Sequence, residues 1–348
     1  MLQLQQVRGT VPVINSLTSF RFITALVVFL FHCQIHFGLD FGVKFVNKFL
    51  SHGAVFMTGF FVLSGFIMTH VYQNWDFGKQ QSIFGYYLKR FAKIYPVYIV
   101  ATFAFFLFFA EDYTGQQWGQ IAVNDLFLTQ GFFASMFHLG LNGGTWSLSV
   151  EMFLYALFPL LMLASGKSPK ILWVALVLTL IVVLNVAFDD KAYTYANPVM
   201  RLGDFMAGMG FYAIKDKPIF KKAWFHILMV VLLVAATALI STHKYMAWQT
   251  LAVFLFGAWI ACVYHSTSVV YNNKPMVYLG LISYSFYVWQ FAAIEAGRSV
   301  LHLGGYQVSL MAFILNVSLS VLSYHLLEEP ARGAILKRWG KRNTRVIA

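Results

Sequence analysis

Residues 16–36 read SLTSFRFITALVVFLFHCQIH, an apolar run long enough to cross a lipid bilayer as a helix. Two ionisable side chains interrupt it, Arg21 near its start and His32 eleven residues further on. At about 100° per residue, eleven steps bring both side chains to one helix face, about 16 Å apart along the axis. Because ionisable groups are costly inside a membrane, this face is a candidate functional surface.

The composition of the whole chain indicates a membrane protein. Of its 348 residues, 59% are hydrophobic and 11% are charged, and the mean hydropathy is +0.67. A soluble globule is not this apolar, and apolar blocks of about 20 residues recur along the chain. We predict an all-α polytopic membrane protein, a single domain over residues 1–348, with about ten transmembrane helices. The expected spans are 17–37, 52–73, 95–111, 145–165, 169–188, 198–214, 224–241, 246–264, 279–299 and 306–327.

The basic residues predict how the chain is oriented. The net charge is +12. Most of the lysines and arginines lie in alternate loops and in the tail at about 330–348, which the prediction places on the same side of the membrane. Because positively charged loops remain in the cytosol, both termini and this basic tail are predicted to be cytosolic. The same distribution argues against nucleic acid as a partner, since the charge is explained by topology.

The sequence predicts neither a disulfide framework nor a metal site. The two cysteines, Cys33 and Cys262, both lie in apolar segments. His32 and His36 are four residues apart, but the helical glutamate that accompanies such a pair in zinc-binding helices is missing between them.

A second ionisable group is expected near His32. Glu151 lies about six residues inside the span 145–165, in the run GGTWSLSVEMFLY, and reaches a similar depth if this helix starts at the opposite membrane surface. Ser147, Glu151 and Tyr155 extend a polar stripe toward the same place. A histidine beside a carboxylate is a common general base, which suits removal of a hydroxyl proton in acyl transfer. The alternative is that His32 has a structural role and only forms a hydrogen bond with a neighbouring helix.

Five motifs in a fixed order, the last of them in two segments, resemble those of the membrane acyltransferase-3 family. They are RFITALVVFLFH at 21–32, similar to the family's Arg-x10-His signature, FFVLSGFIM at 60–68, LKRFAKIYPVY at 88–98, WSLSVE at 146–151, and the closing segments LGLISYSFYVWQF at 279–291 and SYHLLEEPAR at 323–332. The chain departs from the family pattern at Lys93, where arginine is common, and at Gln290, where histidine is frequent.

The resemblance implies an enzyme that moves an acyl group, usually acetyl from acetyl-CoA, to a hydroxyl of a sugar or another envelope acceptor. It implies a bacterial inner (cytoplasmic) membrane protein whose partners are the lipid bilayer and a glycan or lipid-linked sugar. His32 and Glu151 are the catalytic candidates, with His32 as general base or as transient acyl carrier. Two other classes stay open: a proton-coupled transporter or flippase, and a non-catalytic polysaccharide assembly protein.

Basic residues near the predicted cytosolic face are candidates for holding the phosphates of CoA. The cationic donors are Arg21 and the cluster Lys89, Arg90 and Lys93, which lies just before the span 95–111. The alternative is that these residues contact lipid headgroups or only set the topology.

The candidates for acceptor binding are Ser64, Ser147, Tyr155, Arg201 and Asp204. Arg201 and Asp204 are three residues apart and also suit a mutual ion pair. Ser64 also suits helix packing, since the neighbouring glycine allows close approach of a helix or ligand.

Three further expectations concern packing. The segment 112–144 is longer than a connector requires and is expected to cover the acceptor site. Ser283, Tyr287 and Gln290 are expected on one helix face, as part of a polar conduit or a packing surface. Glu328 is expected to pair with Arg332 one turn later.

Overall fold

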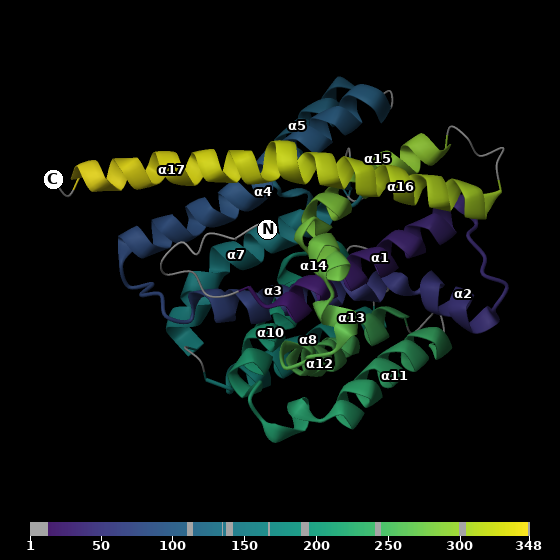
Figure 1. Cartoon of the computed structure of the whole chain (residues 1–348). Helices are drawn as coiled ribbons and strands as arrows, with labels where there is room; N and C mark the ends of the chain where they lie inside the picture. Colours follow the sequence, from purple (N-terminus) through teal and green to yellow (C-terminus); the bar gives the residue numbers. More distant parts are fainter. Residues whose placement is uncertain are drawn as a thin grey trace.

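Helices packed side by side make up the structure (Figure 1). The computed structural model describes residues 13–109, 114–133, 135–136, 142–165, 168–188, 195–240, 245–298 and 304–346. Within these ranges the chain forms helices and connecting turns and no β-strand. The predicted all-α class is therefore confirmed for the part of the chain that the structure describes.

Every predicted apolar segment lies in or overlaps a helix. The helices are α1 (Asn15–Phe37), α2 (Lys44–Ser51), α3 (Phe56–Tyr72), α4 (Gln80–Phe109), α5 (Gly115–Phe127), α7 (Trp146–Ser165), α8 (Ile171–Phe188), α10 (Leu202–Ile214), α11 (Ala223–Leu239), α12 (Tyr245–Tyr264), α13 (Val269–Asn272), α14 (Lys274–Leu281), α15 (Ser283–Arg298), α16 (Gly305–Ser323) and α17 (Glu329–Val346). Short 3₁₀ turns cover Gly53–Val55, Gln130–Phe132, Val199–Arg201 and Pro218–Lys221.

The described part of the chain contains fewer clear membrane spans than the predicted ten. Six described segments are long and apolar enough to cross a membrane: Asn15–Phe37, Gly53–Tyr72, Gln80–Phe108, Trp146–Ser165, Ala247–Tyr264 and Gly305–Trp339. The bent pair α14 and α15 brings the count to seven if it is one span. The described residues thus support six or seven spans, and the cytosolic location of both termini stays a prediction.

Three predicted spans between residues 169 and 241 are not among these segments. α10 has 13 residues, which rise about 20 Å and fall short of a hydrocarbon core of about 30 Å. It is buried against α3 and α8. α11 has 17 residues, at the lower limit for a span. Composition alone does not separate a buried helix such as α10 from a span, because burial in protein and contact with lipid both select apolar residues.

Two glycines let α3 and α10 approach closely. A Cβ atom on Gly65 would lie 2.0 Å from the carbonyl oxygen of Phe205, and one on Gly208 would lie 1.9 Å from that of Val62. Neither position therefore accepts a side chain without displacement of a helix. This contact is the close helix approach that the glycine after Ser64 was expected to allow.

The helix pair α14 and α15 is broken by a bend of 68°. Gly280, next to the break, packs against the backbone of α1, where its Cβ would lie 2.0 Å from the carbonyl oxygen of Thr18. Ser283 begins α15 and donates its hydroxyl to the carbonyl oxygen of Gly280 at 2.8 Å. A polar break of this kind in a membrane helix is tolerated where it is buried in protein or lines a cavity.

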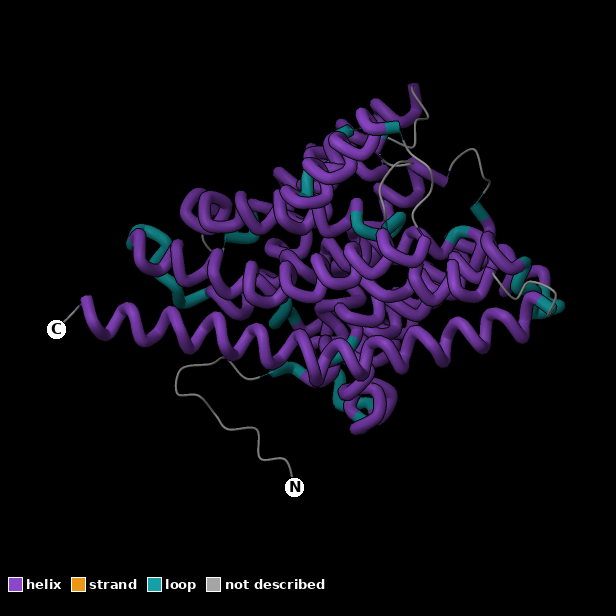
Figure 2. Tube along the Cα trace, turned by 90° about the horizontal axis from the view of Figure 1, so that it is seen from above, coloured by secondary structure: helices purple, strands orange, loops and turns teal. Residues whose placement is uncertain are grey.

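The C-terminal helices form one long rod. α16, a π-helical turn over Tyr324–Glu328 and α17 follow one another as one continuous, gently bent rod, which Figure 1 and Figure 2 show from two directions. α17 lies along the first half of α4, where the rings of Trp339 and Phe84 are 5.9 Å apart. The predicted basic tail at 330–348 is thus helical through Val346, and its last two residues lie outside the described ranges.

The segment 112–144 is described only in part, since residues 112–113, 134 and 137–141 lie outside the described ranges. Its described part contains α5, which begins with a capping box between Thr114 and Gln117. The side chain of Gln130 then donates to the carbonyl oxygen of Thr145 at 3.1 Å, which ties the segment to the start of α7. The expected cover over an acceptor site stays a prediction.

Candidate active site

Two neighbouring cavities lie among the helices. The first has a volume of about 120 Å³ and is called the arginine cavity, because Arg21 and Arg90 line it. The second has a volume of about 310 Å³ and is called the histidine cavity, because His32 and His36 line it. Met57 and Tyr287 line both cavities, which therefore share a wall.

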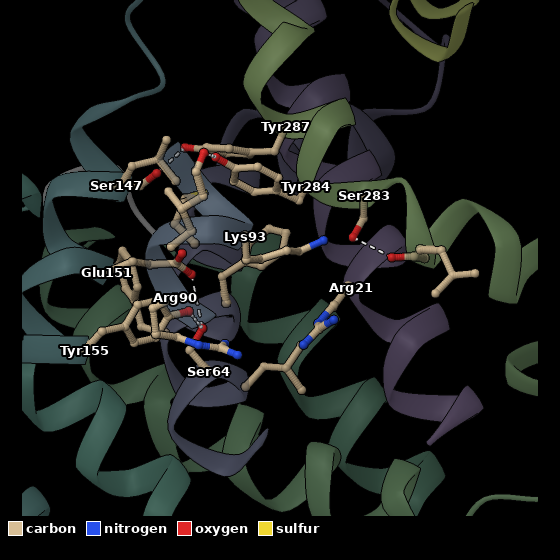
Figure 3. Close-up of a pocket in the computed structure, with 18 residues that line it drawn as sticks. Arg21, Ser64, Arg90, Lys93, Ser147, Glu151, Tyr155, Ser283, Tyr284 and Tyr287 are labelled. Atoms are coloured by element: carbon tan, nitrogen blue, oxygen red, sulfur yellow. Dashed lines mark hydrogen bonds between the residues drawn. The ribbon is translucent and has the colours of Figure 1, made fainter. Parts of the chain in front are cut away.

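The arginine cavity gathers most of the predicted site residues. Its ionisable and hydroxyl-bearing lining residues are Arg21, Ser64, Arg90, Lys93, Ser147, Glu151, Tyr155, Ser283, Tyr284 and Tyr287 (Figure 3). They come from α1, α3, α4, α7 and α15. Because three cations face one carboxylate, the cavity carries an excess of positive charge and favours an anionic ligand.

The two arginines of this cavity differ in how they are held. Arg90 donates to the hydroxyl of Tyr72 at 3.1 Å, and its guanidinium lies 5.4 Å from the centre of that ring. No described residue accepts a hydrogen bond from the guanidinium of Arg21. Figure 3 shows Arg21 and Arg90 directed into one space. A fixed guanidinium beside one with unused donors is suited to binding phosphate.

Glu151 lies at the centre of the polar stripe predicted on α7. Its carboxylate accepts a hydrogen bond from Ser64 at 3.1 Å, and the hydroxyl groups of Ser64 and Tyr155 are 3.4 Å apart. One turn earlier, Ser147 donates to the hydroxyl of Tyr287 at 2.8 Å. The expected alignment of Ser147, Glu151 and Tyr155 is confirmed, and the stripe faces the arginine cavity.

Lys93 and Lys89, grouped by the sequence, have different surroundings. Lys93 lines the arginine cavity and forms an ion pair with Glu328. Lys89 does not line it, and its ammonium lies 4.4 Å from the centre of the Trp75 ring. The reason is helical geometry: Lys89 is about 100° from Arg90 around α4, whereas Lys93, three residues after Arg90, is on nearly the same face.

The ion pair of Glu328 corrects a sequence expectation. Glu328 was expected to pair with Arg332, but its carboxylate is fully buried and accepts from Lys93 and from Ser285, the latter at 2.8 Å. Arg332 instead pairs with Glu329 at 3.0 Å. The π-helical turn that ends at Glu328 explains the difference, since the extra residue per turn rotates this side chain toward α4.

His32 lies in the histidine cavity among aromatic rings. Its ring centre is 4.6 Å from that of Phe291, 5.0 Å from that of Phe31 and 6.0 Å from that of His36. Among the described residues, neither of its ring nitrogens has a hydrogen-bond partner. The imidazole is therefore held by packing and keeps its nitrogen atoms for a ligand.

The structure does not bring His32 and Glu151 into a hydrogen-bonded pair. Glu151 belongs to the arginine cavity and His32 to the histidine cavity. Two side chains at equal depth on different helices need not meet, because the rotation of each helix sets the direction in which its side chain points. Trp146, five residues before Glu151, is the residue of α7 that lines the histidine cavity.

Arg201 and Asp204 form the ion pair that their spacing predicted. Their side chains are 3.1 Å apart and almost fully buried. Arg201 also donates to the backbone carbonyl of Tyr195 at 2.8 Å and to the hydroxyl of Thr58 at 3.1 Å. Neither residue of the pair lines either cavity. These contacts support a structural role for both residues.

Several cavity residues were not singled out from the sequence. Met57 and Tyr284 line the arginine cavity, and Tyr72, which holds Arg90, lies outside its lining; all three are in apolar helices, where nothing in the local pattern separates a site residue from ordinary packing. Of the three residues expected on one helix face, Ser283 and Tyr287 line the arginine cavity, whereas Gln290 is buried and lines neither cavity. Within the described ranges, no cluster of three or more His, Cys, Asp or Glu side chains is arranged to hold a metal ion.

Comparisons with known proteins point to one family. A family model described as an acyltransferase domain matches residues 14–325. The O-acetyl transferase of Shigella phage Sf6 is 19% identical over 329 residues, which cover 90% of this chain and 95% of that protein. The peptidoglycan O-acetyltransferase OatA of Listeria monocytogenes is 24% identical over 317 residues, 78% of this chain and 50% of that protein.

A third relative matches a shorter region. The acyltransferase MdmB of Streptomyces mycarofaciens is 34% identical over 170 residues, 45% of this chain and 42% of that protein. The chain thus spans half or less of two of these relatives and nearly all of the phage protein. No solved structure matches. Because the family model covers the helices that build both cavities, this chain contains an acyltransferase domain and belongs to the acyltransferase-3 family.

Proposed function

We propose that this protein is a membrane-bound O-acetyltransferase that moves an acetyl group from acetyl-CoA to a hydroxyl of a surface polysaccharide or lipid-linked sugar. We place it in a bacterial inner membrane with the arginine cavity toward the cytosol. The observation that carries this proposal is the shared wall of two chemically different cavities. One offers cations for the phosphates of CoA, and the other offers an unpaired histidine for the hydroxyl.

The arginine cavity suits the donor. Arg21 has unused guanidinium donors, and Arg90 is held in position by Tyr72, so the two can bind phosphate oxygens together. Lys93 adds positive charge but is partly neutralised by Glu328. Lys89 faces away from this cavity and has the smaller role, in contact with headgroups or with the outer part of the nucleotide.

The histidine cavity suits the reaction with the acceptor. His32 takes the proton of the acceptor hydroxyl, whose oxygen attacks the carbonyl carbon of the thioester. The carbon–sulfur bond then breaks, and the proton passes from His32 to the departing thiolate of CoA. The thioester reaches His32 at the wall formed by Met57 and Tyr287.

Glu151 supports this reaction from the arginine cavity. Its carboxylate is hydrogen-bonded to Ser64 and lies in one cavity with Arg21 and Arg90. We assign it the role of orienting these cations and, through Ser64 and Tyr155, the polar wall along which the thioester lies. Arg201 and Asp204 are assigned to the fold and not to acceptor binding.

The test is acetyl transfer by purified protein in lipid nanodiscs, from radiolabelled acetyl-CoA to glycan extracted from the host envelope. His32→Ala should lower the transfer rate at least about a thousandfold and leave the Kd for acetyl-CoA within about twofold, because general base catalysis and donor binding are separate. His325→Ala is the control, since His325 is exposed and contacts Tyr278 outside both cavities.

Two results would contradict the proposal. Transfer by His32→Ala at a near wild-type rate would remove His32 from the chemistry. Absence of any transfer by the wild-type protein, with glycan still translocated or assembled in cells that carry the gene, would favour the carrier or assembly protein instead. A labelled acetyl group retained on wild-type protein and lost in His32→Ala would change the role of His32 from base to acyl carrier.

A further inference from the structure

A second histidine of the histidine cavity is tied to a distant helix. His36 follows His32 by one turn of α1, and its Nδ1 atom lies 2.7 Å from a guanidinium nitrogen of Arg298 at the end of α15. Arg298 in turn pairs with Glu295 at 2.8 Å. The chain of contacts therefore runs from Glu295 through Arg298 to His36, which lines the cavity.

This contact decides which nitrogen of His36 carries a proton. A guanidinium has donors and no acceptor, so Nδ1 of His36 must accept the hydrogen bond and carries no proton. In the neutral imidazole the proton is then on Nε2, which becomes a donor. Glu295 holds Arg298 in place and balances its charge. The ring nitrogen left for a molecule in the histidine cavity is an N–H donor of fixed tautomer.

The other residues that line the histidine cavity indicate which kind of ligand would bind beside this N–H donor. They include the rings of Phe31, Trp146, Tyr195, Tyr287 and Phe291, and no lysine, arginine, aspartate or glutamate is among the lining residues that the structure describes. Aromatic faces suit the apolar face of a ring, and the neutral lining offers no partner for a charge. An uncharged sugar with free hydroxyls fits this combination.

We propose that His36 binds the acceptor, an uncharged sugar ring, by donating a hydrogen bond from Nε2 to one of its oxygens, and that Arg298 and Glu295 are positioning residues that fix this tautomer. The inference rests on the proposed function, since it takes the histidine cavity as the acceptor site. It separates the roles of two histidines on one helix: His32 accepts a proton, and His36 donates a hydrogen bond without releasing its proton.

The tautomer can be measured without any activity. In protein labelled with ¹⁵N-histidine, two-bond ¹H–¹⁵N spectra distinguish the two neutral tautomers, and the His36→Gln variant identifies the signals of His36. We expect the Nε2–H tautomer in the wild-type protein and a mixture of tautomers in Arg298→Ala. An Nδ1–H signal in the wild-type protein, or a His36 spectrum unchanged by Arg298→Ala, would overturn the positioning role.

Acceptor binding is measured by kinetics with the extracted glycan. His36→Ala should raise the acceptor KM by roughly tenfold and leave the KM for acetyl-CoA unchanged, because one neutral hydrogen bond is lost at the acceptor. His36→Gln should keep most of the affinity, since the glutamine amide supplies an N–H donor near the position of Nε2. Glycans with carboxylate-bearing sugars in place of neutral ones should be poor acceptors.

Arg298→Ala should raise the acceptor KM several-fold in the wild-type background and have no further effect in His36→Gln, which has no tautomer to fix. Arg332→Ala is the matched control, because Arg332 forms a similar exposed pair with Glu329 away from the histidine cavity. An unchanged acceptor KM in His36→Ala, with wild-type protein active, would refute this inference and leave the proposed function intact. Lack of transfer by wild-type protein would refute the proposed function itself.

Discussion

At the scale of single residues, neighbours in sequence can have unrelated roles. Lys89 and Arg90 are adjacent, yet only Arg90 lines the arginine cavity, while Lys89 packs over Trp75. His32 and His36 share a helix face and a cavity, but only His36 has a fixed hydrogen-bond partner. The number of cations in a motif therefore overstates the number that can meet one ligand.

This difference between Lys89 and Arg90 gives a direct prediction. Arg90→Glu should raise the Kd for acetyl-CoA by more than about tenfold, because a donor to phosphate is replaced by a repelling carboxylate. Lys89→Glu makes the same change of charge one residue earlier and should change the Kd less than about threefold. Isothermal titration with acetyl-CoA measures both. Equal losses of affinity would show that overall charge, and not the cavity, attracts the donor.

At the scale of elements, close contacts and breaks set where the site residues lie. Glycine contacts draw α3 onto α10 and α14 onto α1, and the bend between α14 and α15 turns Ser283 and Tyr287 toward the arginine cavity. The π-helical turn before α17 directs Glu328 toward Lys93 of α4. Each of these features is an irregularity of a helix, and each lies beside a cavity or a buried charge.

The buried pair of Lys93 and Glu328 should anchor the C-terminal rod to α4. Glu328→Gln should lower the free energy of unfolding by about 2 kcal/mol, because it leaves the Lys93 ammonium, largely buried, without its counter-charge. Glu329→Gln, next in sequence, breaks only an exposed pair and should cost less than about 0.5 kcal/mol. Thermal unfolding in detergent, followed by circular dichroism, compares the two. A similar loss in both variants would argue against the anchoring role.

If the loss in Glu328→Gln comes from an uncompensated charge, removing that charge should reverse it. Adding Lys93→Met to Glu328→Gln should therefore restore about half or more of the lost stability. Additive losses in the double variant would mean that the two side chains stabilise the protein independently.

At the scale of the whole molecule, the two cavities lie on a path along α1. Arg21, early in this helix, lines the arginine cavity, and His32 and His36, later in it, line the histidine cavity. Since Met57 and Tyr287 are common to both, a molecule in one cavity is in contact with the wall of the other. The order of these cavities along α1 matches the cytosolic start predicted for this helix.

The orientation is tested by labelling with a membrane-impermeant thiol reagent in intact spheroplasts. Cysteine in place of Val43, which is 51% exposed after α1, should react, whereas cysteine in place of Lys217, exposed after α10, should react only after lysis. The native Cys33 and Cys262 are buried and give little background. The reverse pattern would invert the topology and direct the arginine cavity outward.

The sequence by itself indicated that the chain lies in a membrane, that it is helical and which family it resembles. Apolar length and helical spacing are local properties, so they fixed the membrane helices, the common face of Arg21 and His32 and the polar stripe around Glu151. The tertiary structure decided that α10 is short and buried against α3 and α8, and that His32 and Glu151 line different cavities. It also joined His36 to Arg298, 262 residues away. Such pairings depend on the rotation and bending of helices packed against one another, which composition and spacing within a single helix do not encode.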